Sequence, residues 1–136
     1  MRVIALDVGK RHTGVAYADA LLDVPVPLET IHHENEEELL AAIATLVSER
    51  HIGMLILGLP LLPSGVEAEQ ALYVRQVGKA LQESCKACVI RYLDERRTTK
   101  RAPQDDKAVD DHAQAALTLL QVFLERGARA LEQSGE

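Results

Sequence analysis

Val3-Ile4-Ala5-Leu6-Asp7, continuing as Val8-Gly9-Lys10-Arg11-His12-Thr13-Gly14-Val15-Ala16, is the stretch that decides the fold of this chain. Its unbroken apolar start predicts a strand that is covered on both faces. Gly9 and Gly14 bracket a short polar turn, and the residues after it predict the returning strand of a β-hairpin. Asp7 then ends a buried strand, where an uncompensated carboxylate is costly. We therefore expect Asp7 to bind a cation or hydrogen-bond donors.

The composition is that of one globular domain. The chain has 136 residues, of which 47% are hydrophobic and 26% are charged. No apolar run approaches the roughly 18 residues that a membrane span requires. The first strand is expected almost at residue 1, which leaves no room for a secretion signal. We expect a single domain over 1–136 that is cytoplasmic and has no membrane partner.

A lone C-x-x-C pair, Cys85 and Cys88, follows a predicted helix. Zinc sites usually need a second pair of cysteines or histidines at suitable spacing, and none accompanies this one. We expect the pair to be incidental rather than a zinc or redox centre.

The remaining pattern predicts alternating strands and helices. Asp23 to Pro27 is expected to be irregular or an edge, because proline cannot donate to a strand ladder. Further strands are expected at 28–32, 53–60 and 88–93, and helices after Asn35, from Ser64 to Ser84 and from His112 to about Ala130. The order βββαβαβα predicts a mixed five-stranded sheet with helices on both faces, which is the ribonuclease H-like arrangement.

Acidic residues recur where these elements end or begin. Asp7 ends the first strand, Asp94 and Glu95 end the last, and Asp110 and Asp111 open the final helix. The carboxyl ends of parallel strands meet at one edge of a sheet, which is where ligands usually bind. Mg²⁺ and Mn²⁺ prefer oxygen ligands, and two such ions about 3.5–4 Å apart can assist phosphodiester hydrolysis. The pattern suits a nuclease, although a surface ion pair and helix capping also explain such acids.

The basic residues are clustered although the chain carries a formal net charge of −6. Such clusters are typical of phosphate-backbone contacts, which predicts cleavage that weakens with salt. Only 3% of residues are aromatic, so backbone shape is a better recognition cue than base stacking. The candidates for nucleic-acid binding are Lys10, Arg11, Arg96, Arg97, Lys100 and Arg101.

Four motifs, in order along the chain, resemble those of the YqgF family of Holliday-junction-resolvase-like pre-16S rRNA nucleases. They are Asp7-x-Gly9-x-x-x-x-Gly14-Val15-Ala16, Gly58-Leu59-Pro60 followed by Gly65-x-Glu67, Asp94-Glu95-Arg96-x-x-Thr99, and an alanine-rich helix ending Leu120-Gln121-x-Phe123-Leu124. The resemblance covers nearly the whole chain. It implies a ribonuclease H-like, metal-dependent cytoplasmic nuclease that processes the 5′ end of pre-16S rRNA in ribosome biogenesis.

The resemblance also implies which residues form the site. Asp7 corresponds to the first-strand acid, and Glu95 or Asp94 to the acid of the second motif. His112 stands where many members have aspartate, and Asp111 precedes it, so either residue could be the third ligand. The expected catalytic residues are these five, and the expected ligands of Mg²⁺ or Mn²⁺ are Asp7, Glu95 and Asp111 or His112.

Other functions are compatible with the same sequence. Kinship to junction resolvases implies cleavage of branched DNA in repair, and the altered third ligand is compatible with a catalytically weak nucleic-acid-binding module in ribosome assembly. ATP-using sugar kinases and chaperone ATPases share the fold, but they usually need two such lobes, and 136 residues supply one. The sequence leaves open whether pre-rRNA or branched DNA is the substrate, and whether a homodimer addresses two strands.

Overall fold

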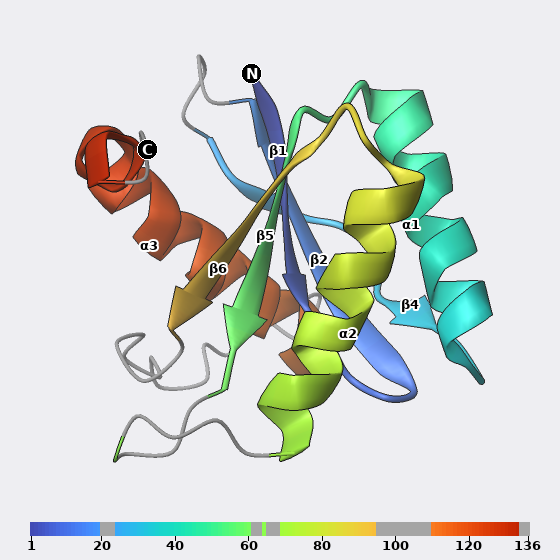
Figure 1. The fold of residues 1–136 in the computed structure, drawn as a ribbon. Helices are drawn as coiled ribbons and strands as arrows, with labels where there is room; N and C mark the ends of the chain where they lie inside the picture. Colours follow the sequence, from blue (N-terminus) through green and yellow to red (C-terminus); the bar gives the residue numbers. More distant parts are fainter. Residues whose placement is uncertain (20–23, 61–63, 65–68, 95–109, 134–136) are drawn as a thin grey trace.

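The fold is a mixed sheet flanked by three helices, seen in a computed structural model that describes residues 1–19, 24–60, 64, 69–94 and 110–133, with side chains up to residue 126 (Figure 1). The strands are β1 (Arg2–Asp7), β2 (His12–Asp19), β3 (Val26–Pro27), β4 (Ile31–His32), β5 (Met54–Leu59) and β6 (Val89–Asp94). The helices are α1 (Glu36–Arg50), α2 (Glu69–Ser84) and α3 (Asp111–Gln133).

The strands are arranged in the order β3-β2-β1-β5-β6, and β4 pairs with β2 off this path. β1 and β2 form the expected antiparallel hairpin, whereas β1, β5 and β6 run parallel. The arrowheads of these three strands therefore point the same way in Figure 1. The arrowheads mark the carboxyl ends of the strands, and ligands usually bind beyond these ends in parallel sheets.

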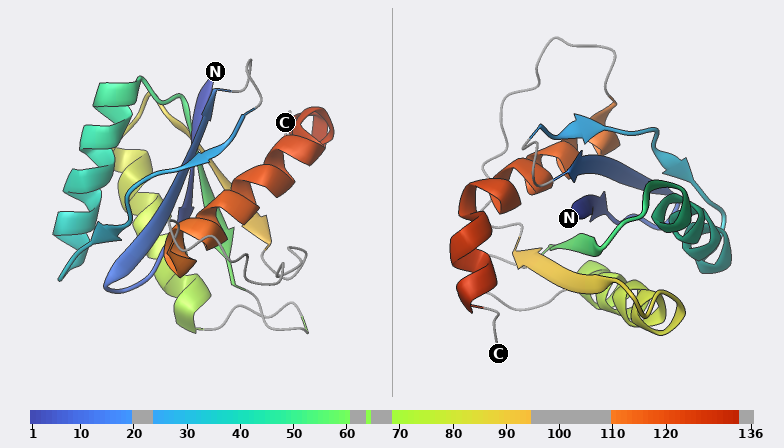
Figure 2. Two further views of the ribbon diagram at one scale, coloured as in Figure 1. Left: turned by 180° about the vertical axis from the view of Figure 1, so that it is seen from behind. Right: turned by 90° about the horizontal axis from the view of Figure 1, so that it is seen from above.

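Helices cover both faces of the sheet (Figure 2). Alternate side chains of a strand point to opposite faces, and β1 shows this clearly. Ile4 and Leu6 join the core under α1 and α2, whereas Val3 and Ala5 join the core under α3. All four are nearly or completely buried, which explains the unbroken apolar run in the sequence.

The third expected strand differs from the prediction. One strand was expected at 28–32, but the structure has two strands of two residues each, β3 and β4, and therefore six strands in the described residues instead of five. The register explains the interruption: Ala16 pairs with Pro27 and Thr13 with Ile31, so three residues (28–30) lie opposite two (14–15), and the extra residue disrupts the ladder. The ribonuclease H-like fold class itself is confirmed.

The first helix begins as its sequence predicts. The side chain of Asn35 accepts a hydrogen bond of 2.9 Å from the backbone N–H of Glu38, and the acidic first turn is favourable against the helix dipole. The second helix was expected from Ser64, but residues 65–68 lie outside the described residues and α2 is described from Glu69. None of the helices within the described ranges has the length and apolar character that crossing a membrane requires.

Candidate active site

Asp7 is the last residue of β1 and is half-buried at the carboxyl edge of the parallel strands. It follows Val3 and Ala5 at a spacing of two, so strand alternation directs it to the face that α3 covers. The turn after it is held from the other side, since the Gln70 side chain of α2 donates to the carbonyl of Val8 at 2.9 Å. β1 thus delivers one carboxylate to the expected edge.

Gly14 brings the start of α3 to this carboxylate. Gly14 is the cross-strand partner of Asp7 in the β1–β2 register. A Cβ atom at Gly14 would overlap the backbone carbonyl of His112 in the first turn of α3. Only glycine permits so close an approach of helix to strand. The first turn of α3 therefore lies against β2 at the residue opposite Asp7.

Asp110 caps α3. Its Oδ1 atom accepts from the backbone N–H of Ala113 at 2.7 Å, and its carboxylate accepts from the Thr30 hydroxyl at 2.9 and 2.8 Å. The bond from Ala113, aided by Thr30, holds the pKa of Asp110 below its ordinary value. Asp110 is therefore ionised at neutral pH and has a structural role that explains it without catalysis.

Asp111 and His112 are the first two residues of α3. Asp111 is exposed and His112 is half-buried. Through the contact at Gly14, the backbone of His112 lies against β2, opposite the residue of β1 that is Asp7. The structure thus unites two of the three elements that the sequence predicts to form the site.

Asp94 reaches the same edge but faces the other way. It ends β6, opposite Leu59 of β5. Ile90, four residues earlier on β6, belongs to the core under α1 and α2, whereas Leu93 packs with the core under α3. Alternation therefore directs Asp94 to the face opposite Asp7. Glu95, the other expected acid of this motif, lies outside the described residues.

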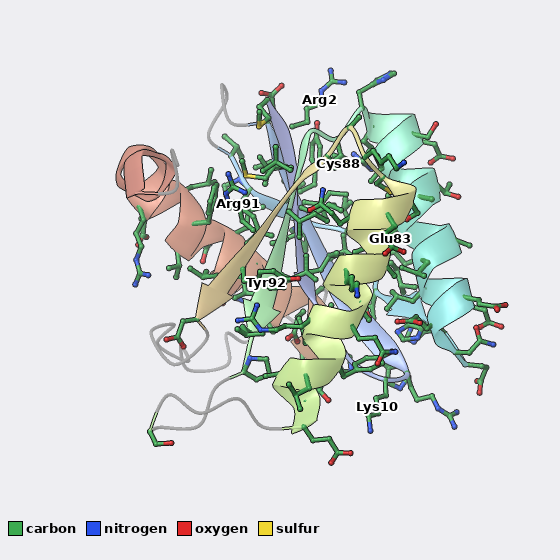
Figure 3. All side chains as sticks on the ribbon, in the orientation of Figure 1. Arg2, Lys10, Glu83, Cys88, Arg91 and Tyr92 are labelled. Atoms are coloured by element: carbon green, nitrogen blue, oxygen red, sulfur yellow. The ribbon has the colours of Figure 1, made fainter. Side chains whose placement is uncertain are left out.

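Two of the six expected phosphate contacts are described. Lys10 and Arg11 are exposed in the turn between β1 and β2, at the site end of the sheet (Figure 3 labels Lys10). Arg11 forms an ion pair with Glu34 at 2.8 Å, so its guanidinium is already shared with a carboxylate. The other four, Arg96, Arg97, Lys100 and Arg101, lie outside the described residues.

The histidines near this turn were not predicted as a group. His33 is 3% exposed, and its Nε2 atom lies 2.9 Å from the buried Thr13 hydroxyl. Burial lowers the pKa of His33, so it is neutral at pH 7. His12 is exposed, but its ring also contacts those of His32 and His112. No local spacing in the sequence signals these contacts, which join three different elements.

A bound divalent ion requires several donor side chains close to one point. Within the described part of the chain, no three or more His, Cys, Asp or Glu side chains are grouped so that they could hold a metal ion. The described candidates offer carboxylate oxygens from Asp7 and Asp111, which suit Mg²⁺ or Mn²⁺, and an imidazole nitrogen from His112, which suits a transition metal such as Mn²⁺ better than Mg²⁺. The chemistry of these donors fits such an ion, and Glu95, the further expected ligand, lies outside the described residues.

The two cysteines of the C-x-x-C pair are free thiols. Cys88 is buried and lies 3.3 Å from the carbonyl oxygen of Ile52, and burial raises its pKa. A thiol of this kind is a poor nucleophile.

Comparison with known proteins bears on both family and fold. The family model RuvX, described as Holliday junction resolvase, matches residues 1–126. A Chloroflexus aurantiacus protein named "Putative pre-16S rRNA nuclease" is 38% identical over 102 residues, which cover 75% of this chain and 66% of the relative. The chain therefore spans just under two thirds of that relative. A Picosynechococcus protein of the same name is 34% identical over 131 residues, covering 90% of each chain.

Solved structures support the fold. Thermus thermophilus RuvC in complex with a Holliday junction substrate superposes with a TM-score of 0.66 at 14% identity, covering 95% of this chain and 96% of that one. Another Thermus thermophilus RuvC structure gives a TM-score of 0.65 at 13% identity, covering 96% and 97%. At such identities the likeness establishes the ribonuclease H-like fold. The family resemblance seen in the sequence motifs is confirmed by the family match.

Proposed function

The chain belongs to the RuvX (YqgF) family, and we propose that it is a cytoplasmic, divalent-metal-dependent nuclease that hydrolyses phosphodiester bonds at the 5′ end of pre-16S rRNA. The curated relatives are named for this substrate, which supports the assignment. The observation that carries the proposal is the contact of the first turn of α3 with β2 at Gly14, directly across from Asp7.

Asp7 is the central ligand in this proposal. It is half-buried at the end of a strand in which the four residues before it are buried, so an ion there would offset the desolvation of the carboxylate. Asp111 or His112 contributes the second donor from α3. Glu95 contributes the third, and we assign it the role in preference to Asp94, because Asp94 is directed to the face opposite Asp7 and away from α3. When bound, the ion supplies Lewis acidity to the reacting phosphate.

The identity of the α3 donor has a chemical consequence. Carboxylate oxygen suits both Mg²⁺ and Mn²⁺, whereas imidazole nitrogen favours transition metals over Mg²⁺. If His112 is the donor, Mn²⁺ supports activity better than Mg²⁺ and His112→Asp restores activity with Mg²⁺. If Asp111 is the donor, Asp111→Asn removes activity with both ions.

The positive groups near the site would hold the phosphate backbone. Lys10 is exposed at the turn that follows Asp7, and the N-terminus of α3 adds a favourable dipole for negative charge. Arg11 would have to exchange Glu34 for phosphate. The other contacts are proposed at Arg96, Arg97, Lys100 and Arg101. Phosphate contacts release counterions, so cleavage should weaken with salt.

A second candidate substrate is branched DNA. The description of the family as Holliday junction resolvase favours it. The proposed metal ligands and phosphate-binding residues are the same for both substrates, because these residues contact the backbone and not the bases. We propose pre-rRNA first, because the two curated relatives compared here carry that name.

A cleavage assay tests the proposal. Wild-type protein and two variants are incubated with pre-16S rRNA, a four-way DNA junction and single strands, in Mg²⁺, Mn²⁺ or a chelator. Asp7→Asn should abolish metal-dependent cleavage of the preferred substrate. The matched control is Asp19→Asn, at the other end of the same hairpin, where Asp19 pairs with Arg2 in register; it should cleave normally. Full activity of Asp7→Asn, or cleavage in the chelator, would refute the proposal.

A further inference from the structure

Three imidazole rings from three elements meet at the start of α3. The ring centroids of His12 and His112 are 5.1 Å apart with the planes inclined by 35°. Those of His12 and His32 are 5.0 Å apart in an edge-to-face arrangement, and their Nδ1 atoms are 2.8 Å apart, a hydrogen-bond distance. His12 therefore contacts both of the other rings.

The backbone around His32 fixes where it presents its ring. His32 is the register partner of His12 in the β2–β4 pair. The backbone N–H of His33 donates to the carbonyl of Arg11 at 2.9 Å, and the His33 ring pairs with the Thr13 hydroxyl. Because these bonds lie immediately beside the His12–His32 pair, β4 holds the beginning of β2 in place.

The same segment also holds α3. Thr30, next to β4, donates its hydroxyl to the carboxylate of Asp110, the residue that caps α3. Thr30 and Asp110 are 80 positions apart in the chain. The segment from Thr30 to His33 thus connects the capped end of α3 at one side with His12 at the other. Both connections bear on the first turn of α3.

We infer that His12 is a positioning residue that holds the imidazole of His112 against the site, and that His32 holds His12. This rests on the proposed function only in taking His112 as a donor to the ion. A half-buried side chain on the first turn of a helix otherwise samples several rotamers. Contact with a ring that is itself hydrogen-bonded removes that freedom before an ion binds, which favours binding. Outer-shell partners of this kind typically change metal affinity by about 10–100-fold when removed.

A direct metal-ligand role for His12 is less well supported. The described residues contain no group of three donors arranged to hold an ion. The Nδ1 atom of His12 is already engaged by His32. Its contact with His112 is between rings, as expected of a residue that orients a neighbour.

The test uses the imidazole proton and carbon signals of the five histidines of the chain, followed at one pH while Mn²⁺ is added. In wild-type protein, Mn²⁺ should broaden the His112 signal. His12→Ala should shift that signal before metal is added and raise the Mn²⁺ concentration for half-broadening about tenfold. His32→Ala should shift it less.

Two further variants separate positioning from a general loss of structure. His12→Phe keeps a ring against His112 but loses the hydrogen bond to His32, so it should recover most of the Mn²⁺ response. His51→Asn changes an exposed histidine at the left-handed C-cap of α1, which asparagine tolerates, and should leave the His112 signal unmoved. Urea unfolding of each variant verifies that it is folded.

The outcomes distinguish this inference from the proposed function. An unmoved His112 signal and unchanged Mn²⁺ response in His12→Ala would overturn the inference, even if the wild-type protein cleaves RNA. Failure of Mn²⁺ to broaden His112 in the wild-type protein would also overturn it. The expected shifts without cleavage of any substrate would support the positioning role and refute the nuclease proposal.

Discussion

The two ends of the β1–β2 hairpin carry the same kind of residue in different surroundings. At one end, Asp19 lies opposite Arg2 and forms an ion pair with it at 4.0 Å. At the other end, Asp7 lies opposite Gly14, and the absent side chain admits the first turn of α3. Figure 3 shows the labels Arg2 and Lys10 at these opposite ends. The cross-strand partner of each aspartate, rather than the aspartate itself, distinguishes a surface ion pair from a candidate active site.

After the loss expected for Asp7→Asn, the largest effect is expected at Glu95, another proposed metal ligand. Glu95→Gln should reduce cleavage by about a hundredfold or more, because loss of a metal ligand removes several kcal/mol of transition-state stabilisation and 1.4 kcal/mol is about tenfold in rate. Asp94→Asn, which changes a residue on the face opposite Asp7, should change cleavage by less than about tenfold. Initial rates at saturating Mn²⁺ measure both. A larger loss in Asp94→Asn would reverse the assignment.

A methyl group added at Gly14, opposite Asp7 in the β1–β2 hairpin, should disturb the fold as well as the site. Gly14→Ala is expected to destabilise the protein by about 1–3 kcal/mol, since its Cβ atom would overlap the backbone of His112. Gly53→Ala is the control, because the nearest atom to its Cβ would be Cγ of the flexible Met1 side chain, at 3.3 Å. Urea unfolding should show a change within about 0.5 kcal/mol for the control. Equal effects would argue against the close approach at Gly14.

The buried His33, which pairs with Thr13 on β2, predicts that the stability of the fold depends on pH. The pKa of His33 is lowered in the folded state by burial, so the unfolded chain binds the proton first as the pH falls. Stability should therefore decrease below about pH 6.5, by at most about 1.4 kcal/mol per pH unit. His33→Gln should flatten this dependence in unfolding curves between pH 5 and pH 8. The exposed control, His51→Asn, should retain it; a His33→Gln curve parallel to wild type would contradict the prediction.

The ion pair at the other end should matter least. Arg2 and Asp19 have side chains that are 43% and 24% exposed, and such pairs contribute at most about 1 kcal/mol. A double-mutant cycle with Arg2→Ala and Asp19→Asn measures the coupling free energy of unfolding. A coupling free energy above about 2 kcal/mol would contradict the description of Arg2 and Asp19 as a weak surface ion pair.

The sequence predicts the local features of this molecule well and the long-range ones poorly. The strand at Val3 to Leu6 and the helix cap at Asn35 depend on residues that are adjacent in the sequence, and both are found where expected. The bond between Thr30 and Asp110 joins positions 80 apart, and no local pattern signals it. Asp110 is a cap in the structure, although the sequence made it one of several candidate acids.

The candidate site shows the same division. The position of Asp7 at the end of a buried strand follows from its own segment. Strand alternation directs Asp94 to the face of the sheet opposite Asp7, but this can be deduced only once the register of β6 is known. The buried His33 pairs with Thr13, which lies on β2 and is itself completely buried. Contacts of this kind depend on how the elements pack, which periodicity alone does not determine.

The central claim is that Asp7 and the first turn of α3 belong to one metal-binding site. Calorimetric titration of Mn²⁺ into wild type, Asp7→Asn and Asp19→Asn tests it without any nucleic acid. We expect Asp7→Asn to weaken binding at least about tenfold, because a ligand matters at least as much as its outer-shell partners, and Asp19→Asn to bind like wild type. Equal Mn²⁺ affinity in Asp7→Asn and wild type would contradict the claim.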